Sequence, residues 1–256
     1  MPNSFLNLGH IHGIGTDDLN GDSATAKVRA GSYSYATNGF GPVIYMYCRN
    51  TSGSIMDQGD LMSRLADVAL TNITSGTTTS ATKASAWTAD KHLGEILYVQ
   101  DNDDSAGAAP EGEASIIGSN TTGVANVDPS YPYSVALAAN DDLDTISPGW
   151  HLQDSAASDK SQEVKGVVVA KAGVTSLYYG WLQVYGICPI VALKASTGFT
   201  DRAAIIADTK AIAPDANGGW ELVIGYSVGT VTSDIVSDKA PAFLNLYAPT
   251  LNAGTP

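Results

Sequence analysis

The residues best suited to chemistry are two histidines near the start of the chain, His10 and His12, which are separated by one residue. In an extended segment their imidazoles would lie on the same side. Asp17, Asp18 and Asp22 follow and would add carboxylates to a zinc or other divalent-ion site. No further ligand follows at a fixed spacing, and such histidines are more often surface or interface residues. We therefore predict no metal site.

Two acidic runs offer the oxygen ligands that calcium prefers, Asp18-Leu-Asn-Gly-Asp22 and Asp101-Asn-Asp-Asp104. Neither has the loop register, ending in a bidentate glutamate, that identifies an EF-hand. Acidic turns are the favoured interpretation, and calcium bridging between subunits is the alternative.

Acid and base catalysis of hydrolysis would need a pair of carboxylates, and no motif pairs any of the available glutamates. A nucleophile elbow, a phosphate loop, a zinc-protease helix and a dinucleotide fingerprint are all missing from the sequence. We predict that the protein is not an enzyme and that it uses no cofactor. The glutamates considered are Glu95, Glu111, Glu113, Glu163 and Glu221.

Aromatic residues in the second half of the chain could line a sugar-binding groove, and they could equally fill a core. Alternation along residues 178–185 places Tyr179, Trp181 and Gln183 on one face of a strand. Large aromatics dominate core and interface burial, so packing is favoured over carbohydrate stacking. The aromatics considered are Trp181, Tyr185, Trp220, Tyr226 and Tyr247.

Composition narrows the possible partners. The 256 residues carry 13 Lys and Arg against 26 Asp and Glu, a net charge of −13, and no basic cluster could follow a phosphate backbone. We therefore expect no nucleic-acid partner. No apolar run spans a bilayer and the first residues lack signal-peptide features, so we expect a soluble protein made in the cytoplasm.

The two cysteines and the three glycosylation sequons need no functional explanation. Cys48 and Cys188 lie in apolar strand-like runs, which predicts buried free thiols, although a disulfide stays open. The sequons at Asn50, Asn72 and Asn120 are interpreted as chance matches in a Thr-rich chain.

Strand signals recur at short intervals and predict an all-β fold, an antiparallel β-sandwich or small β-barrel. Two aromatic runs, residues 178–185 and 187–194, meet at Gly186 and predict a hairpin. Residues 59–70 are the one helix candidate, because Leu61, Leu65 and Val68 have helical spacing. Residues 71–82 are expected to form a loop or a polar strand. Further strands are expected at 42–48, 94–100, 113–118, 133–137, 164–170, 202–208, 220–228 and 243–247.

Three segments follow from these patterns. Residues 1–40 are rich in glycine and predict an extended N-terminal arm that lies on another subunit. Residues 41–163 would form an N-terminal β-rich domain, and residues 164–256 a C-terminal small β-barrel module.

Part of the C-terminal module resembles a known group of proteins. Gly180-Trp-Leu-Gln-Val-Tyr-Gly186, a following strand, an Ala-rich segment ending in Asp208, and Trp220-Glu-Leu-Val-Ile-Gly-Tyr226 are similar to the C-terminal region of virion structural proteins of tailed bacteriophages. Those it resembles most are small β-rich proteins that decorate or cement the icosahedral head. The resemblance covers residues 164–250.

The resemblance implies a capsid decoration protein without catalytic residues, which binds the major capsid protein on the outside of the shell. Such a protein is usually a symmetric oligomer and stabilises the shell against internal DNA pressure. A tail, spike or head-fibre subunit that binds host carbohydrate is the alternative, and it would have the same fold class.

Overall fold

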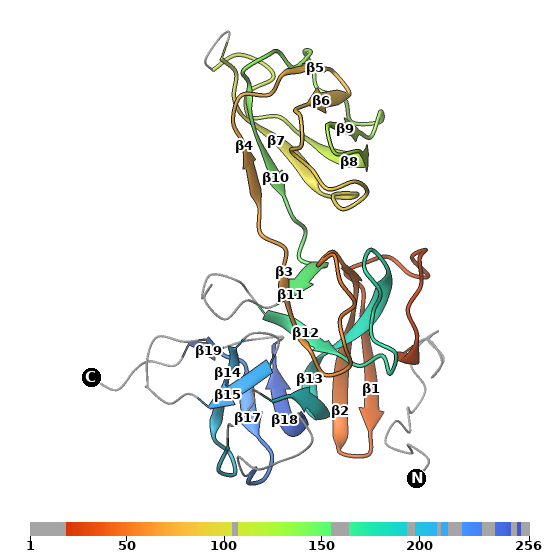
Figure 1. Ribbon diagram of the computed structural model, residues 1–256, viewed down its shortest axis with the longest axis vertical. Coiled ribbons are helices and arrows are strands. Elements are labelled where there is room, and N and C mark those ends of the chain that lie inside the picture. The colour runs from red at the N-terminus through yellow and green to blue at the C-terminus, as the bar shows by residue number, and fades with distance from the viewer. Residues whose placement is uncertain are drawn as a thin grey trace, which may run out of the picture. The chain divides into compact units, whose positions relative to one another are not determined.

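A computed structural model describes residues 19–103, 107–154, 164–193, 198–208, 211–214, 222–231, 239–246 and 250–251. The chain divides into two compact units. Unit 1 comprises Met1–Arg64 and Gly149–Pro256, and unit 2 is Leu65–Pro148, inserted between two strands of unit 1 (Figure 1). Among the described residues, helix is confined to Leu19 and Asn20, which confirms the predicted all-β class.

Unit 1 contains twelve of the strands. One large sheet has the strand order β1-β2-β11-β3-β12-β13-β18-β17-β14-β15, and β16 and β19 form a separate pair. Their bounds are β1 Tyr33–Asn38, β2 Gly41–Asn50, β3 Leu61–Arg64, β11 His151–Asp154, β12 Val164–Val168, β13 Tyr179–Ala192, β14 Ala204–Asp208, β15 Ala211–Pro214, β16 Leu222–Val223, β17 Gly225–Ser227, β18 Lys239–Asn245 and β19 Thr250–Leu251.

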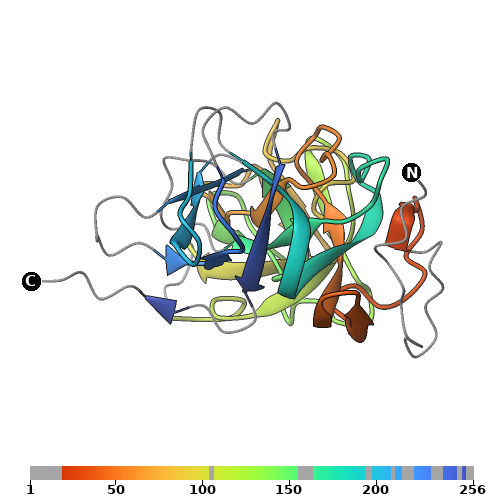
Figure 2. The same cartoon turned by 90° about the horizontal axis from the view of Figure 1, so that it is seen from below.

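The large sheet closes on itself twice, and β13 belongs to both closures. β2 pairs with β13 as well as with β11, so β2, β11, β3, β12 and β13 form a ring. Beyond this ring β13 pairs with β18, and the following β17, β14 and β15 curl until Ile212 bridges Leu193, just after β13. In Figure 2 β13 (teal) and β18 (dark blue) lie side by side.

Gly186 marks the point where β13 changes partners. Its φ of +90° is one that side chains rarely allow, and a Cβ there would meet the Pro42 carbonyl oxygen and Val43 of β2. The expected hairpin turn at this glycine was wrong, because Tyr179–Ala192 is one continuous strand. Because glycine has no side chain, the strand can bend at this point and the backbone of β2 can approach closely. The same conformational freedom of glycine had suggested a turn.

A single apolar cluster fills both rings. It includes Met46, Leu61 and Leu182 in the first ring, and Ile205 and Leu244 in the second. Along β13, Leu182 and Val184 belong to this cluster, whereas Tyr179 and Trp181 belong to a second cluster on the opposite face with Leu19 and Tyr45. The alternation predicted for this strand is confirmed.

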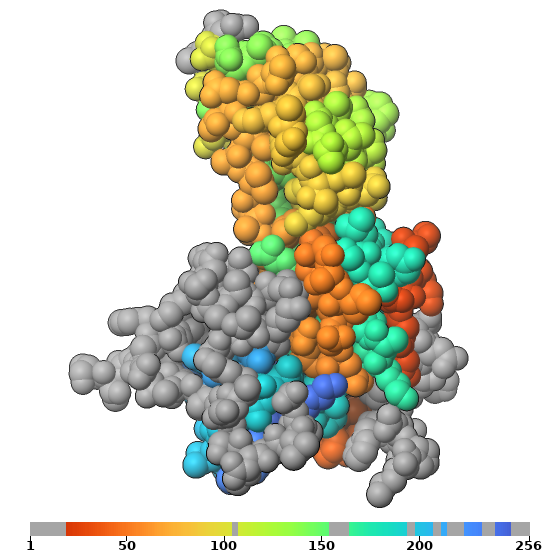
Figure 3. Space-filling model, in the orientation of Figure 1, coloured from red at the N-terminus to blue at the C-terminus, as the bar shows by residue number. Residues whose placement is uncertain are grey.

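Unit 2 is a separate antiparallel sheet with the order β4-β10-β7-β8-β9-β6-β5, and Figure 3 shows it as a well-packed body, coloured orange to green. Strands such as β8 alternate between buried and exposed residues, as expected where one face covers a core. Tyr133 and Leu137 close that core from a segment outside the strands. The strand bounds are β4 Val68–Leu70, β5 Ser75–Thr77, β6 Ser80–Thr82, β7 Ile96–Asp101, β8 Ala114–Asn120, β9 Val124–Val127 and β10 Asp142–Ile146.

The predicted domain boundaries were wrong. Residues 41–64 belong with the C-terminal half, because β2 pairs along β13 from Tyr179 to Tyr185. The predicted arm was also wrong for residues 19–40: Leu19 is fully buried beside Trp181, and Tyr33–Asn38 is a strand. Residues 1–18 lie outside the described part of the chain.

Two local predictions were also wrong. The expected helix at 59–70 is replaced by β3 and β4, and Leu61, Met62 and Ser63 are all buried. A strand that is buried on both faces shows no alternation of apolar and polar residues. The helical spacing of the apolar residues in 59–70 was therefore a coincidence. The expected strand at 133–137 is a segment outside the strands that covers the core of unit 2. Of the two possibilities for 71–82, the structure has a polar hairpin, β5 and β6.

Candidate interaction surface

The glutamates considered for catalysis make separate structural contacts. Glu113 accepts hydrogen bonds from the backbone and hydroxyl of Ser134, and Glu111 accepts one from the backbone of Gly107. Glu163 and Glu221 lie outside the described residues. Glu111 and Glu113 therefore hold loops in place by hydrogen bonds.

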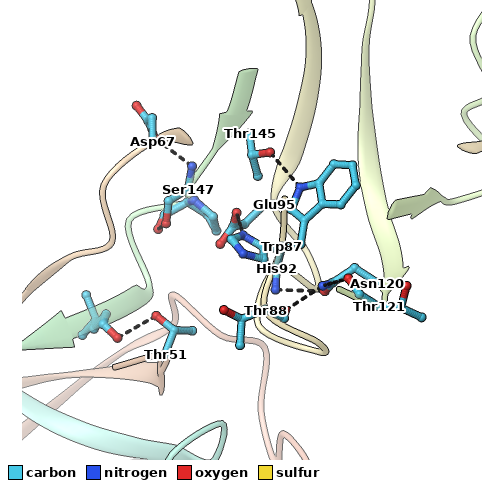
Figure 4. Close-up of polar contacts among 12 residues, drawn as sticks. Thr51, Asp67, Trp87, Thr88, His92, Glu95, Asn120, Thr121, Thr145 and Ser147 are labelled. Carbon is cyan, nitrogen blue, oxygen red and sulfur yellow. Dashed lines mark hydrogen bonds and ion pairs between the residues drawn. The ribbon is translucent and has the colours of Figure 1, made fainter. Parts of the chain in front are cut away.

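Glu95 is the exception, because it forms a buried polar pair with His92 in unit 2. Its Oε2 lies 2.8 Å from His92 Nδ1, and both residues are almost completely buried. The Asn120 side chain accepts a hydrogen bond from the His92 backbone and donates to the Thr88 carbonyl, at 3.1 and 2.7 Å (Figure 4). Every contact fixes the turn that precedes β7. Sequence reasoning missed this pair, although histidine and glutamate three residues apart in a turn were a possible signal.

The described residues do not bring the candidate metal ligands of the sequence together. His10, His12, Asp17 and Asp18 lie outside it, and Asp22 accepts a hydrogen bond from Thr175 N at 2.7 Å. In the second acidic run Asp104 is not described. Among the described residues no group of three or more histidine, cysteine, aspartate or glutamate side chains could hold a metal ion.

Both cysteines are buried free thiols, as predicted. Burial raises the pKa of Cys188 to about 12 and raises that of Cys48 further. The sequon residues Asn50 and Asn120 are buried and engaged in hydrogen bonds, whereas Asn72 is exposed.

The described aromatics among those considered for sugar binding differ in their exposure. Trp181 is buried against Tyr47, with ring centroids 4.9 Å apart. Tyr185 is half-buried, and Tyr226 is 46% exposed. Trp220 and Tyr247 lie outside the described residues. Packing is therefore confirmed for Trp181, and Tyr226 faces solvent.

A row of apolar side chains crosses the outer face of the second ring. Ile187 of β13 is opposite Phe243 of β18, which is opposite Tyr226 of β17. Alternate residues of β18, Ala242 and Leu244, point into the core, so Phe243 points outward. We call Ile187, Phe243 and Tyr226 the outer row.

Among the described aromatic residues of unit 1, the most exposed lie on β1, at the end of the large sheet. Tyr33 and Tyr35 are 49% and 63% exposed, and Phe40 in the turn to β2 is 48% exposed. The Asn38 side chain donates to the Ile187 carbonyl at 2.9 Å, which fixes the turn end of this hairpin beside the outer row. We call the side of β1 that faces away from β2 the β1 edge.

Charge is distributed unevenly around these surfaces. Unit 2 contains twelve Asp and Glu against two Lys, a net charge of −10, so unit 1 carries −3. Residues 23–56, which include the β1–β2 hairpin, contain Lys27, Arg29 and Arg49 and no carboxylate side chain. The hairpin is thus a neutral to basic region of an acidic protein.

Comparison with known proteins gives no relative. No family model, no curated protein and no solved structure matches this chain. Among the described residues, no helix has the length and apolar character needed to cross a membrane. Function must therefore be argued from the surfaces themselves.

Proposed function

We propose that this chain is a structural protein of a tailed-phage particle, a capsid decoration or cement protein that binds the outer surface of the shell and stabilises it. Its partners would be the major capsid protein and neighbouring copies of itself, and its location the capsid exterior. The resemblance of residues 164–250 to such proteins motivates the proposal.

The observations that carry the proposal are the exposed aromatic residues of unit 1 and the lack of carboxylates in its β1–β2 hairpin. Tyr35 and Tyr226 expose large rings, and residues 23–56 bring no carboxylate to the hairpin. Aromatic residues are enriched and charges depleted at the cores of protein interfaces. A protein that docks on a shell needs such a surface.

The architecture supports the same role. Two closed rings share one 14-residue strand and one continuous core, so most strands of unit 1 are paired on both sides. Closure removes the exposed edges at which unwanted association begins. Unit 2, with its charge of −10, would add a strongly hydrated acidic body to the particle.

A binding experiment tests the proposal. Purified protein is added to particles that were assembled without it, and binding and DNA release on heating are followed. We expect saturable binding to the exterior and a higher temperature of DNA release. Tyr226→Lys should weaken binding, whereas Tyr131→Lys in unit 2, at a site that is 60% exposed, should leave it unchanged. Absence of binding would contradict the proposal.

The alternative is a tail, spike or head-fibre subunit that binds host-surface carbohydrate. The exposed Tyr226 and the neighbouring Phe243 favour it, because aromatic faces can stack on sugar rings. Glycan binding by the purified chain, lost in Tyr226→Ala, would select this alternative.

A further inference from the structure

We propose that the β1 edge is a self-association surface, at which β1 of one copy pairs antiparallel with β1 of a second copy. This inference does not depend on what the resulting dimer binds. It rests on three properties of Tyr33–Asn38: backbone groups that point outward, side chains that do not block pairing, and a lack of negative charge.

The register of the hairpin determines which backbone groups point outward. Tyr47 N donates to Ser32 O at 2.9 Å, so the carbonyl of Ser32 points towards β2. In an antiparallel ladder every second residue pair is hydrogen-bonded in this way. Ser34 and Ala36 are opposite Tyr45 and Val43 and continue this alternation. The N–H and C=O groups of Tyr35 and Thr37 therefore point away from β2, and β1 is the last of the described strands of its sheet.

The residues of β1 themselves provide none of the protections that an edge strand can carry in its own sequence. Natural edge strands are shielded by lysine, proline, bulges or an inward charge. Tyr-Ser-Tyr-Ala-Thr-Asn has no charge and no proline, and its pairing with β2 is regular over all six residues. The opposite end of the large sheet differs, because Ile212 of β15 is bridged by Leu193 and Pro214 ends the strand.

A second copy is the occupant that the side chains and charges favour. Antiparallel pairing about the centre of β1 places the exposed Tyr35 of each copy beside Tyr35 or Thr37 of the other, and aromatic cross-strand pairs are stabilising. Two copies that each carry −13 repel, so they can approach most easily where carboxylates are missing. Residues 23–56 provide such a region.

The test compares two tyrosines of similar exposure, Tyr35 at 63% and Tyr131 at 60%. Sedimentation equilibrium from about 1 μM to about 200 μM should reveal a wild-type dimer. Tyr35→Lys should raise its dissociation constant at least about tenfold, and Thr37→Pro, which removes an outward N–H, should do the same. Tyr131→Lys should leave it unchanged. Circular dichroism establishes that each variant is folded.

Cross-linking tests the geometry. The double variant Tyr35→Cys/Thr37→Cys should give a disulfide-linked dimer under mild oxidation, because in either register a cysteine of one copy lies directly opposite a cysteine of the other. The native Cys48 and Cys188 are buried and should not contribute, and Tyr131→Cys should give no disulfide-linked dimer. A wild type that is monomeric throughout, or a dimer that is indifferent to Tyr35→Lys and Thr37→Pro, would overturn the proposal. Either result would direct attention to a strand from a different protein.

Discussion

The two units use different means to hold an all-β chain together. Unit 1 closes its strands into two rings around one apolar cluster, with the long β13 common to both. Both units bury hydrogen-bonded polar side chains, but unit 2 has the smaller core and contains the buried pair of His92 and Glu95, with the Tyr133 hydroxyl donating to the Leu97 carbonyl at 2.8 Å. Unit 1 should therefore be most sensitive to changes in backbone geometry, and unit 2 to the loss of a polar partner.

The largest expected effect is at Gly186, where both rings depend on one backbone conformation. Gly186→Ala combines a left-handed φ with contact against the Pro42 carbonyl and should lower the free energy of unfolding by about 3 kcal/mol or more. Gly112→Ala is the matched control, because its φ is +80° and nothing lies within 4 Å of the added Cβ. It should cost about 1 kcal/mol.

Urea unfolding of the full chain measures both glycine variants, and hydrogen exchange assigns each loss to a unit. Exchange in β2 and β13 should increase in Gly186→Ala, with β7 and β8 unchanged. Equal losses of unfolding free energy in the two variants would mean that position 186, where β13 changes partners, tolerates a side chain.

Glu95→Ala should be the next most disruptive change and should act on unit 2. Removing the carboxylate leaves His92 buried without this partner, at a cost of about 3 kcal/mol. Glu113→Ala removes a half-buried carboxylate whose hydrogen bonds are exposed, and should cost less than about 1 kcal/mol. Hydrogen exchange should become faster in β7 and β8 of Glu95→Ala and not of Glu113→Ala. A similar increase in both variants would contradict the claim that burial makes the Glu95 carboxylate more important for stability.

Tyr133→Phe should have a smaller effect, because it removes one hydroxyl and keeps the ring in the core of unit 2. The lost hydrogen bond to Leu97 predicts a destabilisation of about 1 kcal/mol. Tyr131→Phe, at an exposed position, should be neutral in the same thermal unfolding experiment. Destabilisation by Tyr131→Phe instead would contradict this assignment.

The smallest effect concerns alkaline pH and distinguishes the units again. Burial raises the pKa of Cys188 to about 12 from 9.0, and burial also raises the pKa values of Cys48 and Tyr45, all in unit 1. A folded-state pKa above the unfolded value gives stability that is complete below the unfolded pKa and is lost as pH rises. Stability should therefore fall above about pH 9.

Two measurements check this expectation. Hydrogen exchange should show the alkaline loss mainly in unit 1, since burial raises the pKa values of Cys48, Cys188 and Tyr45 there, and that of Tyr133 in unit 2. Both thiols should react slowly with iodoacetamide until the chain unfolds. Rapid labelling of Cys188 in the folded protein would contradict its burial.

Period-two patterns predicted much of the fold. Strands buried on one face, such as Ile96–Asp101 and Ala114–Asn120, were found near their expected positions. Strands buried on both faces gave ambiguous signals, and Leu61–Arg64 was mistaken for part of a helix. The insertion of unit 2 was not predictable, because it depends on the long-range pairing of β2 with β13.

The candidate surface was only partly predictable. Tyr226 was singled out by its residue type, whereas Tyr33 and Tyr35 were assigned to an extended arm because glycines surround them. Their importance follows from the position of β1 at the end of a sheet, which is a property of topology. The pairing of His92 with Glu95 likewise depends on a turn that no sequence motif defines.

The copy number of this chain in purified particles, measured by quantitative mass spectrometry against the main shell protein, tests the central proposal most directly. A capsid decoration protein should be present at a ratio near one, or at one copy for a few shell subunits. A handful of copies per particle would favour a tail or spike subunit, and absence of the chain from the particles would contradict a structural role in the virion.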